Sequence, residues 1–273
     1  MFIDEIIRKG LEEDIGSGDI TTRYLDLEPQ NNIAYIIPKE EGVLAGVDVA
    51  RLVFRMVDPE LKIVLYNKDG DKIMPNGEIM RLEGRPSSIL QGERTALNFL
   101  QRLSGIATKT AKFVSLLEGT NVKLLDTRKT TPLLRSLEKY AVRVGGGYNH
   151  RFGLFDMVLI KENHIRACGS ITEAVNRIRK HNTSYKIEVE VTNLKEVDEA
   201  AKAKVDRVML DNMTPAQIRK AVKKYKDILE FEVSGGITEE NIRSFAETGV
   251  QFISSGALTH SYKSLDISLL FKE

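Results

Sequence analysis

From Lys123 onward, short apolar runs alternate regularly with helix-forming stretches, and this alternation limits the possible fold more than any other feature of the sequence. The runs cover residues 124–125, 157–160, 187–191, 207–210, 231–233 and 252–253. A strand every roughly 20–30 residues, with a helix signature between, is typical of βα units around a parallel sheet. Six or seven such units favour a barrel over an open two-layer sheet.

Helix-start signals separate the later runs. A capping residue that accepts a hydrogen bond from a backbone N–H near the helix start is the usual signal, and proline suits the first helical position. The signals are Ser170 with Glu173, Asn193 with Glu196, Thr214 before Pro215, and Thr238, whose helix is expected to end near Gly249.

The first hundred residues show a different, mixed pattern. Ile3, Ile6, Ile7 and Leu11 recur at helical spacing, and the expected helix stops at the glycines of 16–18. Strands are expected at 33–37, 62–66 and 79–82, a helix with one apolar face at 49–56, and a long helical region at 88–103. We therefore expect an α+β domain at 1–104 and a βα domain at 105–273, with the extreme C-terminus packing back on the first domain.

The net charge and the cysteine content of the chain argue against several classes of protein. The 40 Lys and Arg against 39 Asp and Glu leave a net charge of +1, which argues against a nucleic-acid or membrane-surface partner. The single cysteine, Cys168, excludes an internal disulfide. Acidic residues occupy the N-terminal stretch and no apolar run approaches the ~18 residues of a membrane span. We expect a cytoplasmic protein.

Polar residues follow each apolar run. They lie at 126–129, Lys161, Glu190, Asp211, 234–236 and 254–256. In a βα barrel the carboxyl ends of the strands converge on one face, which carries the chemistry. A single charged residue at a strand end indicates only that the strand reaches the surface there. Six such strand ends together predict one functional site at the same end of the barrel.

The predicted site combines cationic side chains, two acids and glycine turns. Arg128, Lys129 and Lys161 are cationic, and His150-Arg151 precede the second strand, a concentration of charge that suits an anionic ligand. Glu190 and Asp211 oppose these cations, so the ligand should also carry hydroxyls, a metal ion or developing positive charge. Glycine turns at 234–238 and 255–257 resemble barrel phosphate sites.

Other site types find little support. The sequence has no G-x-x-x-x-G-K-[ST] motif, and the glycines of 145–147 do not form G-x-G-x-x-G. The four histidines lack zinc-protease spacing. A Schiff base at Lys161, as in a barrel aldolase or lyase, remains an alternative to an electrostatic role.

Nine blocks along the chain resemble the quinolinate phosphoribosyltransferase family, also called nicotinate-nucleotide pyrophosphorylase. They are EDIGSGDITT (13–22), ERTALN (93–98), DTRKTTP (126–132), GGGYNHR (145–151), LIKENHI (159–165), EVEV (188–191), MLDNM (209–213), VSGGIT (233–238) and LTHS (258–261). Departures are small: Leu133 stands where glycine is common, and Glu162 where aspartate is usual.

The resemblance implies an activity and an architecture. Quinolinate and phosphoribosyl pyrophosphate would condense to nicotinate mononucleotide, pyrophosphate and carbon dioxide, with Mg²⁺ accompanying the donor, on the de novo route to NAD. The fold would be an N-terminal α/β sandwich followed by an incomplete, open α/β barrel of the TIM type. The protein would form a homodimer, or a larger assembly of dimers, with shared active sites. A molybdenum-locus relative with another substrate shares much of the pattern and is a second interpretation.

The resemblance also implies roles for individual residues. The quinolinate-binding residues would be Arg94 (from the neighbouring subunit), Arg128, Lys129, His150, Arg151 and Lys161. The phosphoribosyl pyrophosphate-binding residues would be Lys161, Glu190, Asp211, Ser234, Gly235, Gly236, Ser255, Gly256 and His260. Lys129, Lys161, Glu190 and Asp211 would be catalytic, with Glu190 and Asp211 facing Mg²⁺ on the donor.

Overall fold

The computed structural model describes residues 3–27, 30–181 and 184–272. The chain forms two compact units that are each discontinuous in sequence. The first unit holds residues up to 111 together with 131–146 and the C-terminal stretch from 262, and the second unit holds 112–130 and 147–261. The expected boundary at 104/105 falls inside helix α4 (Pro86–Ser115), which runs on past it.

Among the described residues of the first unit there are five helices. Their bounds are α1 (Ile3–Ile15), α2 (Ile20–Tyr24), α3 (Val47–Val57), most of α4, and α5 (Arg135–Val144). The predicted first helix is confirmed, since Ile6, Ile7 and Leu11 of α1 are buried on one side. Helix α3 likewise buries Val49 and Val53. Helix α5 was not anticipated.

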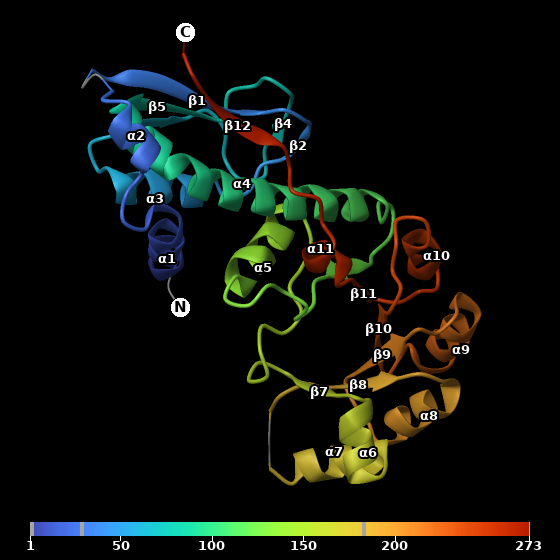
Figure 1. Ribbon diagram of the computed structural model, residues 1–273. Coiled ribbons are helices and arrows are strands. Elements are labelled where there is room, and N and C mark those ends of the chain that lie inside the picture. Colours follow the sequence, from blue (N-terminus) through green and yellow to red (C-terminus); the bar gives the residue numbers. More distant parts are fainter. Residues whose placement is uncertain (1–2, 28–29, 182–183, 273) are drawn as a thin grey trace. The chain divides into compact units, whose positions relative to one another are not determined.

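The first unit's main sheet is antiparallel and uses both ends of the chain (Figure 1). Its order is β12 (Ile267–Phe271), β1 (Asn32–Pro38), β5 (Met80–Gly84) and β3 (Lys62–Leu65). Alternate residues of β1 are buried, as expected when one face of a sheet covers a core. A second, two-stranded sheet pairs β2 (Gly42–Val43) with β4 (Lys72–Ile73).

A buried carboxylate ties the segment 131–146 to α4 within the first unit. Glu138 of α5 is fully buried, and it accepts hydrogen bonds from Arg102 Nε at 3.0 Å and from the Thr131 backbone N–H at 3.1 Å. Arg102 also contacts the Thr131 hydroxyl. A charge this deep is tolerated only when paired.

The described part of the second unit is built on six parallel strands. In spatial order they are β6 (Lys123–Leu125), β11 (Phe252–Ser254), β10 (Glu230–Ser234), β9 (Arg207–Asp211), β8 (Ile187–Val191) and β7 (Val158–Ile160). Among the described residues β6 and β7 do not pair with each other, so the barrel is open. This confirms the predicted open α/β barrel and all six predicted strands.

Helices follow most strands of the second unit. They are α6 (Glu162–Cys168), α7 (Ile171–Arg179), α8 (Leu194–Lys202), α9 (Pro215–Tyr225), α10 (Ile242–Ala246) and α11 (Ala257–His260). The predicted starts of α7, α8 and α9 are confirmed, because Ser170, Asn193 and Thr214 each accept a backbone N–H three residues on. In Figure 1, α7, α8 and α9 lie one after another along the outside of the sheet.

One predicted helix is misplaced. Helix α10 begins at Ile242 and its C-cap is Glu247, so the predicted limits at Thr238 and Gly249 are wrong. The Thr238 N–H donates instead to the Asn241 side chain at 2.8 Å, which forms a turn before the helix.

Within the described residues no helix is long and apolar enough to cross a membrane.

The Glu138 cluster generates a stability prediction. Glu138→Ala should lower the free energy of unfolding by about 3 kcal/mol, because it leaves the Arg102 charge without its buried partner. Urea unfolding followed by circular dichroism measures the change. Glu12→Ala, which removes an exposed ion pair with Lys9 in the same unit, is the control and should leave the midpoint unchanged. Equal midpoints for Glu138→Ala and wild type would contradict the assigned role.

Candidate functional site

A cavity of about 600 Å³ lies within the second unit at the carboxyl ends of the strands. It is lined by Thr127, Arg128, Lys129, His150, Arg151, Leu159, Lys161, Glu190, Met209, Asp211, Asn212, Glu232, Ser234, Gly235, Gly236 and Ser254. Ten of the residues predicted from the sequence are therefore brought together in one place. Parallel strands explain this, since Lys161 directly follows β7 while Asp211 and Ser234 end β9 and β10.

Two guanidinium groups form the strongly cationic part of the cavity. Arg151 is 9 % exposed, and its Nη1 donates to the Met157 carbonyl at 3.3 Å. Burial lowers the pKa of Arg151, and the charge of nearby Arg128 lowers it further. Two neighbouring like charges at a partly buried site favour a ligand that brings more than one negative charge.

A lysine and two carboxylates face the same cavity. Lys161 Nζ forms an ion pair with Glu190. Asp211 accepts a hydrogen bond from Asn212 Nδ2 at 2.9 Å. Burial raises the pKa of Asp211, and the charge of Glu190 raises it further. A divalent cation beside these oxygens would relieve their repulsion, and carboxylate oxygen is the ligand that Mg²⁺ prefers.

Glycine is structurally required in the turn after β10. Gly235 has φ +92°, and a Cβ there would lie 2.3 Å from Asn212 Oδ1. Backbone N–H groups can approach a ligand closely at such a position. Because α10 starts only at Ile242, these amides rather than a helix N-terminus are what the turn offers to an anion.

A second close approach occurs at Gly256, which precedes α11. A Cβ on Gly256 would lie 2.8 Å from Lys129 Cδ and 3.0 Å from His260 Nε2. Thr259 Oγ1 donates to the Lys129 carbonyl at 2.8 Å. Gly256 and His260 therefore lie beside a cavity-lining lysine, although neither lines the cavity itself. Ser255 is buried, and its amide donates to the Leu125 carbonyl at 3.0 Å.

Arg94 is the predicted site residue that lies elsewhere. It is exposed on α4 in the first unit, and it does not line the cavity of the second unit.

Two buried acids, Glu188 and Glu232, lie against His150, and Glu232 itself lines the cavity; neither was assigned a role from the sequence. His150 Nε2 is 3.1 Å from Glu188 Oε2 and 3.4 Å from Glu232 Oε2. Glu188 and Glu232 are 1 % and 0 % exposed. Burial lowers the pKa of His150, but hydrogen bonds to the two carboxylates raise it by more. Burial also raises the pKa of Glu188.

The ring of His150 is held at both nitrogens. Its Nδ1 accepts the Arg151 backbone N–H at 2.7 Å, so the hydrogen of a neutral ring is on Nε2 and points to the acids. The predicted role of His150 in binding quinolinate stays a prediction, and direct contact through a ring nitrogen would require one of these bonds to break. One ligand atom from each of His150, Glu188 and Glu232 lies within 4.8 Å of the others. A hydrogen on Nε2 fits an internal hydrogen bond better than a metal ion.

Strand alternation could have identified these acids. Glu188 and Glu232 precede Glu190 and Ser234 by two residues, so their side chains face the same side of the sheet. Acidic residues inside otherwise apolar runs were the available signal.

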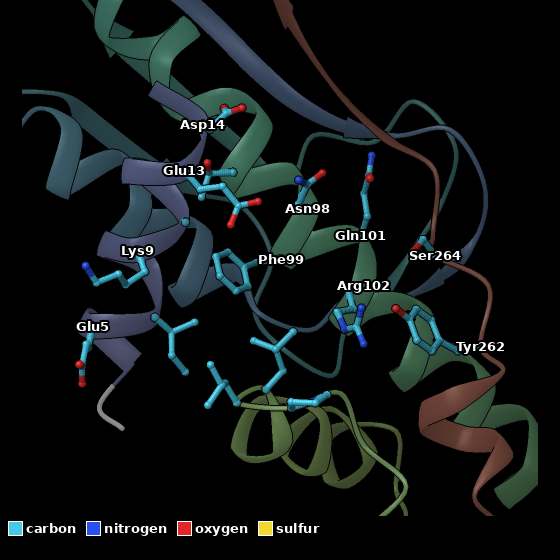
Figure 2. Close-up of a pocket in the computed structure, with 16 residues that line it drawn as sticks. Glu5, Lys9, Glu13, Asp14, Asn98, Phe99, Gln101, Arg102, Tyr262 and Ser264 are labelled. Carbon is cyan, nitrogen blue, oxygen red and sulfur yellow. The ribbon is translucent and has the colours of Figure 1, made fainter. Parts of the chain in front are cut away.

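A larger cavity of about 860 Å³ lies within the first unit (Figure 2). Glu5, Lys9, Glu13 and Asp14 of α1 line it together with Phe99 and Arg102 of α4 and with Tyr262. The Arg102 guanidinium lies 5.1 Å from the Tyr262 ring centroid. None of the residues predicted to form the site lines this cavity.

Comparison with known proteins agrees with the geometry of the second unit's cavity. Residues 19–104 and 106–270 match the family models of the quinolinate phosphoribosyl transferase N-terminal and C-terminal domains. A Bacillus subtilis (strain 168) protein described as probable nicotinate-nucleotide pyrophosphorylase (carboxylating) is 47 % identical over 258 residues, which cover 94 % of this chain and 89 % of that protein.

Solved structures agree. The nicotinate-nucleotide pyrophosphorylase of Francisella tularensis superposes with a TM-score of 0.94 at 45 % identity, covering 99 % of this chain and 96 % of that one. The corresponding protein of Ehrlichia chaffeensis gives a TM-score of 0.96 at 41 % identity, covering 100 % and 99 %. With both domains matched across nearly its whole length, this chain belongs to the quinolinate phosphoribosyltransferase family.

Proposed function

We propose that this protein transfers the phosphoribosyl group of phosphoribosyl pyrophosphate to quinolinate, releasing pyrophosphate and carbon dioxide and forming nicotinate mononucleotide for NAD synthesis. The observation that carries the proposal is a single cavity lined by Arg128 and Arg151 together with the Lys161–Glu190 pair and Asp211. The names of its relatives point to the same reaction. We further propose that the enzyme works in the cytoplasm as a homodimer.

The cationic part of the cavity suits quinolinate, which is a dianion. Arg128 and Arg151 would each bind a carboxylate with two parallel hydrogen bonds, the geometry for which guanidinium is best suited. Lys129 and Lys161 would lie between this carboxylate group and the pyrophosphate of the donor. Without such cations, two like charges at ~4 Å repel by ~4 kcal/mol at an effective dielectric constant near 20.

The acidic part suits the ribosyl carbon. The lone pair of the pyridine nitrogen forms a bond to C1′ while the bond from C1′ to the pyrophosphate oxygen breaks, so C1′ becomes oxocarbenium-like. Carboxylates of Glu190 and Asp211 would stabilise that charge and bind the ribose hydroxyls. The turn 234–236, together with Ser255, Gly256 and His260, would hold the 5′-phosphate through backbone amides and side chains.

Magnesium fits the same two acids. Glu190 and Asp211 would face Mg²⁺ carried by the donor, which when bound would neutralise part of the pyrophosphate charge. After transfer the pyridine nitrogen is cationic and accepts the electron pair left when the adjacent carboxylate departs as carbon dioxide. A proton then takes the vacated ring position, and the protein needs to supply little beyond orientation.

The alternative Schiff-base role of Lys161 finds no support in the geometry. Its ammonium group is paired with Glu190, whereas a Schiff base requires a lysine with a free electron pair.

Substrate choice tests the proposed function. Quinolinate with phosphoribosyl pyrophosphate and Mg²⁺ should yield carbon dioxide and nicotinate mononucleotide, whereas nicotinate should react at least about a hundredfold less well in kcat/KM, because it leaves one charged clamp unpaired. Chromatography of the nucleotide and capture of labelled carbon dioxide measure both. Comparable kcat/KM for the two acids, or turnover only with another substrate as expected of the molybdenum-locus relative, would refute the proposal.

Subunit mixing tests the shared site. Arg94 is exposed and lies outside the cavity of its own second unit, so we propose that it completes the cavity of a partner subunit. Arg94→Ala and Lys161→Ala should each be inactive alone, yet regain part of the activity when mixed and allowed to exchange, since one of the two sites then has both residues. Demonstrated exchange without recovered activity would place Arg94 in its own subunit's site.

Substitution of the acids tests the division of the cavity. Glu190→Gln and Asp211→Asn should lower kcat by about 10²–10³-fold, as for other lost electrostatic contacts to a transition state, and leave quinolinate affinity near wild type. Arg128→Ala should instead weaken quinolinate binding directly. Isothermal titration without the donor separates the two. Abolished quinolinate binding in Asp211→Asn would show that the acids organise the pyridine pocket.

A further inference from the structure

The cluster of His150, Glu188 and Glu232 raises a question that the proposed reaction does not answer. Both acids are almost completely buried, Glu232 lines a pocket argued to bind anions, and Glu188 contacts a histidine that lines the same pocket. Electrostatics alone would make acids at this place unfavourable for the ligand. Their presence therefore calls for a different physical role.

The two acids are incompletely satisfied. Within the part of the chain that the structure describes, neither Glu188 Oε1 nor Glu232 Oε1 has a partner in good hydrogen-bond geometry, although the buried Ser254 hydroxyl is near enough to Glu232 to help lower the pKa of that carboxyl. The second oxygen of each carboxylate is engaged: both Oε2 atoms face His150 Nε2, and Glu232 Oε2 also lies 3.4 Å from Arg207 Nη1. Both acids thus direct one oxygen to the same histidine nitrogen.

His150 connects the two acids to the backbone through further hydrogen bonds. Its Nδ1 accepts the Arg151 amide N–H at 2.7 Å, and its own amide donates to Asp126 Oδ1 at 2.9 Å. Asp126 is itself fully buried and also accepts from Asn149 Nδ2 at 2.5 Å. The backbone at 150–151 is held at consecutive amides, one by Asp126 and one by the ring that the acids orient.

We propose that Glu188 and Glu232 are positioning residues, which orient the His150 ring through its Nε2–H and thereby fix the backbone from which Arg151 reaches into the cavity. The inference rests on the proposed function in one respect only: it names the carboxylates of quinolinate as the groups that Arg151 receives. The ring has a hydrogen on Nε2 in both its neutral and its cationic form, so its contact with the acids does not depend on protonation, whereas the bond from the Arg151 amide needs the lone pair of Nδ1 and therefore the neutral ring.

The sign of the mutational effect distinguishes positioning from electrostatics. Glu188→Ala and Glu232→Ala should raise the KM and Kd for quinolinate by about ten- to a hundredfold, as when supporting partners of a binding side chain are lost. The KM for phosphoribosyl pyrophosphate should change less than about twofold, since Arg151 is not among the residues proposed to hold the donor. A purely electrostatic role predicts tighter anion binding. Glu188→Gln and Glu232→Gln keep an acceptor oxygen and should restore part of the affinity.

A matched control lies on the same strand as Glu232. Glu230 also pairs with Arg207, at 3.1 Å from Nη2, but its side chain is 38 % exposed and it does not line the cavity. Glu230→Ala should leave both KM values unchanged. Thermal unfolding of every variant separates lost affinity from lost fold.

Nitrogen NMR of the ligand-free protein gives a readout independent of activity. With ¹⁵N-labelled histidine, and His150→Gln to assign the signal, Nε2 of His150 should bear a slowly exchanging hydrogen that exchanges rapidly in the alanine variants. A His150 ring without a hydrogen on Nε2, or folded alanine variants with wild-type or tighter quinolinate affinity, would overturn the proposal. If wild type neither binds nor converts quinolinate, the proposed function fails, and the NMR result alone decides the role of the acids.

Discussion

Parallel strand direction is the constraint on which the site depends. All six strands of the second unit run the same way, so their carboxyl ends emerge at one edge and whatever follows each strand gathers there. Asp211 and Ser234, from strands separated by a full helix in sequence, are register partners in neighbouring strands. No binding energy is needed to assemble these groups, because the core that buries the strands has already done so.

Opposite charges lie side by side at the ends of these strands. Cations from 128–129, 151 and 161 line the cavity together with Glu232, Glu188 is buried beside the same histidine, and Arg207 balances part of the charge of Glu232 from the adjacent strand. A chain with nearly equal numbers of acids and bases thus brings both kinds of charge together at one place. This arrangement keeps the cations oriented while the ligand is away, which spares the cost of reorganising them when it arrives.

The spacing of apolar residues along the sequence was sufficient to predict most of the fold. The spacing of Ile6, Ile7 and Leu11 predicted α1, and the apolar runs predicted all six strands of the open barrel. The same reasoning failed at α10, where the side chain of Asn241 turns the chain before the helix begins. It also did not predict that residues 131–146 belong to the first unit, since that depends on the contact between Arg102 and Glu138.

Prediction of the site had a similar limit. Polar residues at strand ends were visible as a pattern, and Arg128, Lys161, Glu190 and Asp211 do line one cavity. Glu188 and Glu232 were not predicted as site residues. An acid within a strand is normally expected to be exposed, and only its neighbours in space show that it is buried.

Strand β12 has a consequence for how the molecule is made. It supplies one edge of the first unit's sheet by pairing with β1, so two segments from opposite ends of the chain must meet. During synthesis β1 emerges long before β12 and has no partner on that side until β12 follows it. Non-local pairing of this kind is slow, and an exposed strand edge invites association with other chains. Because β12 follows the second unit in sequence, the first unit cannot be completed until the second has been translated, and a nascent chain stalled before β12 would present an open sheet edge to its surroundings.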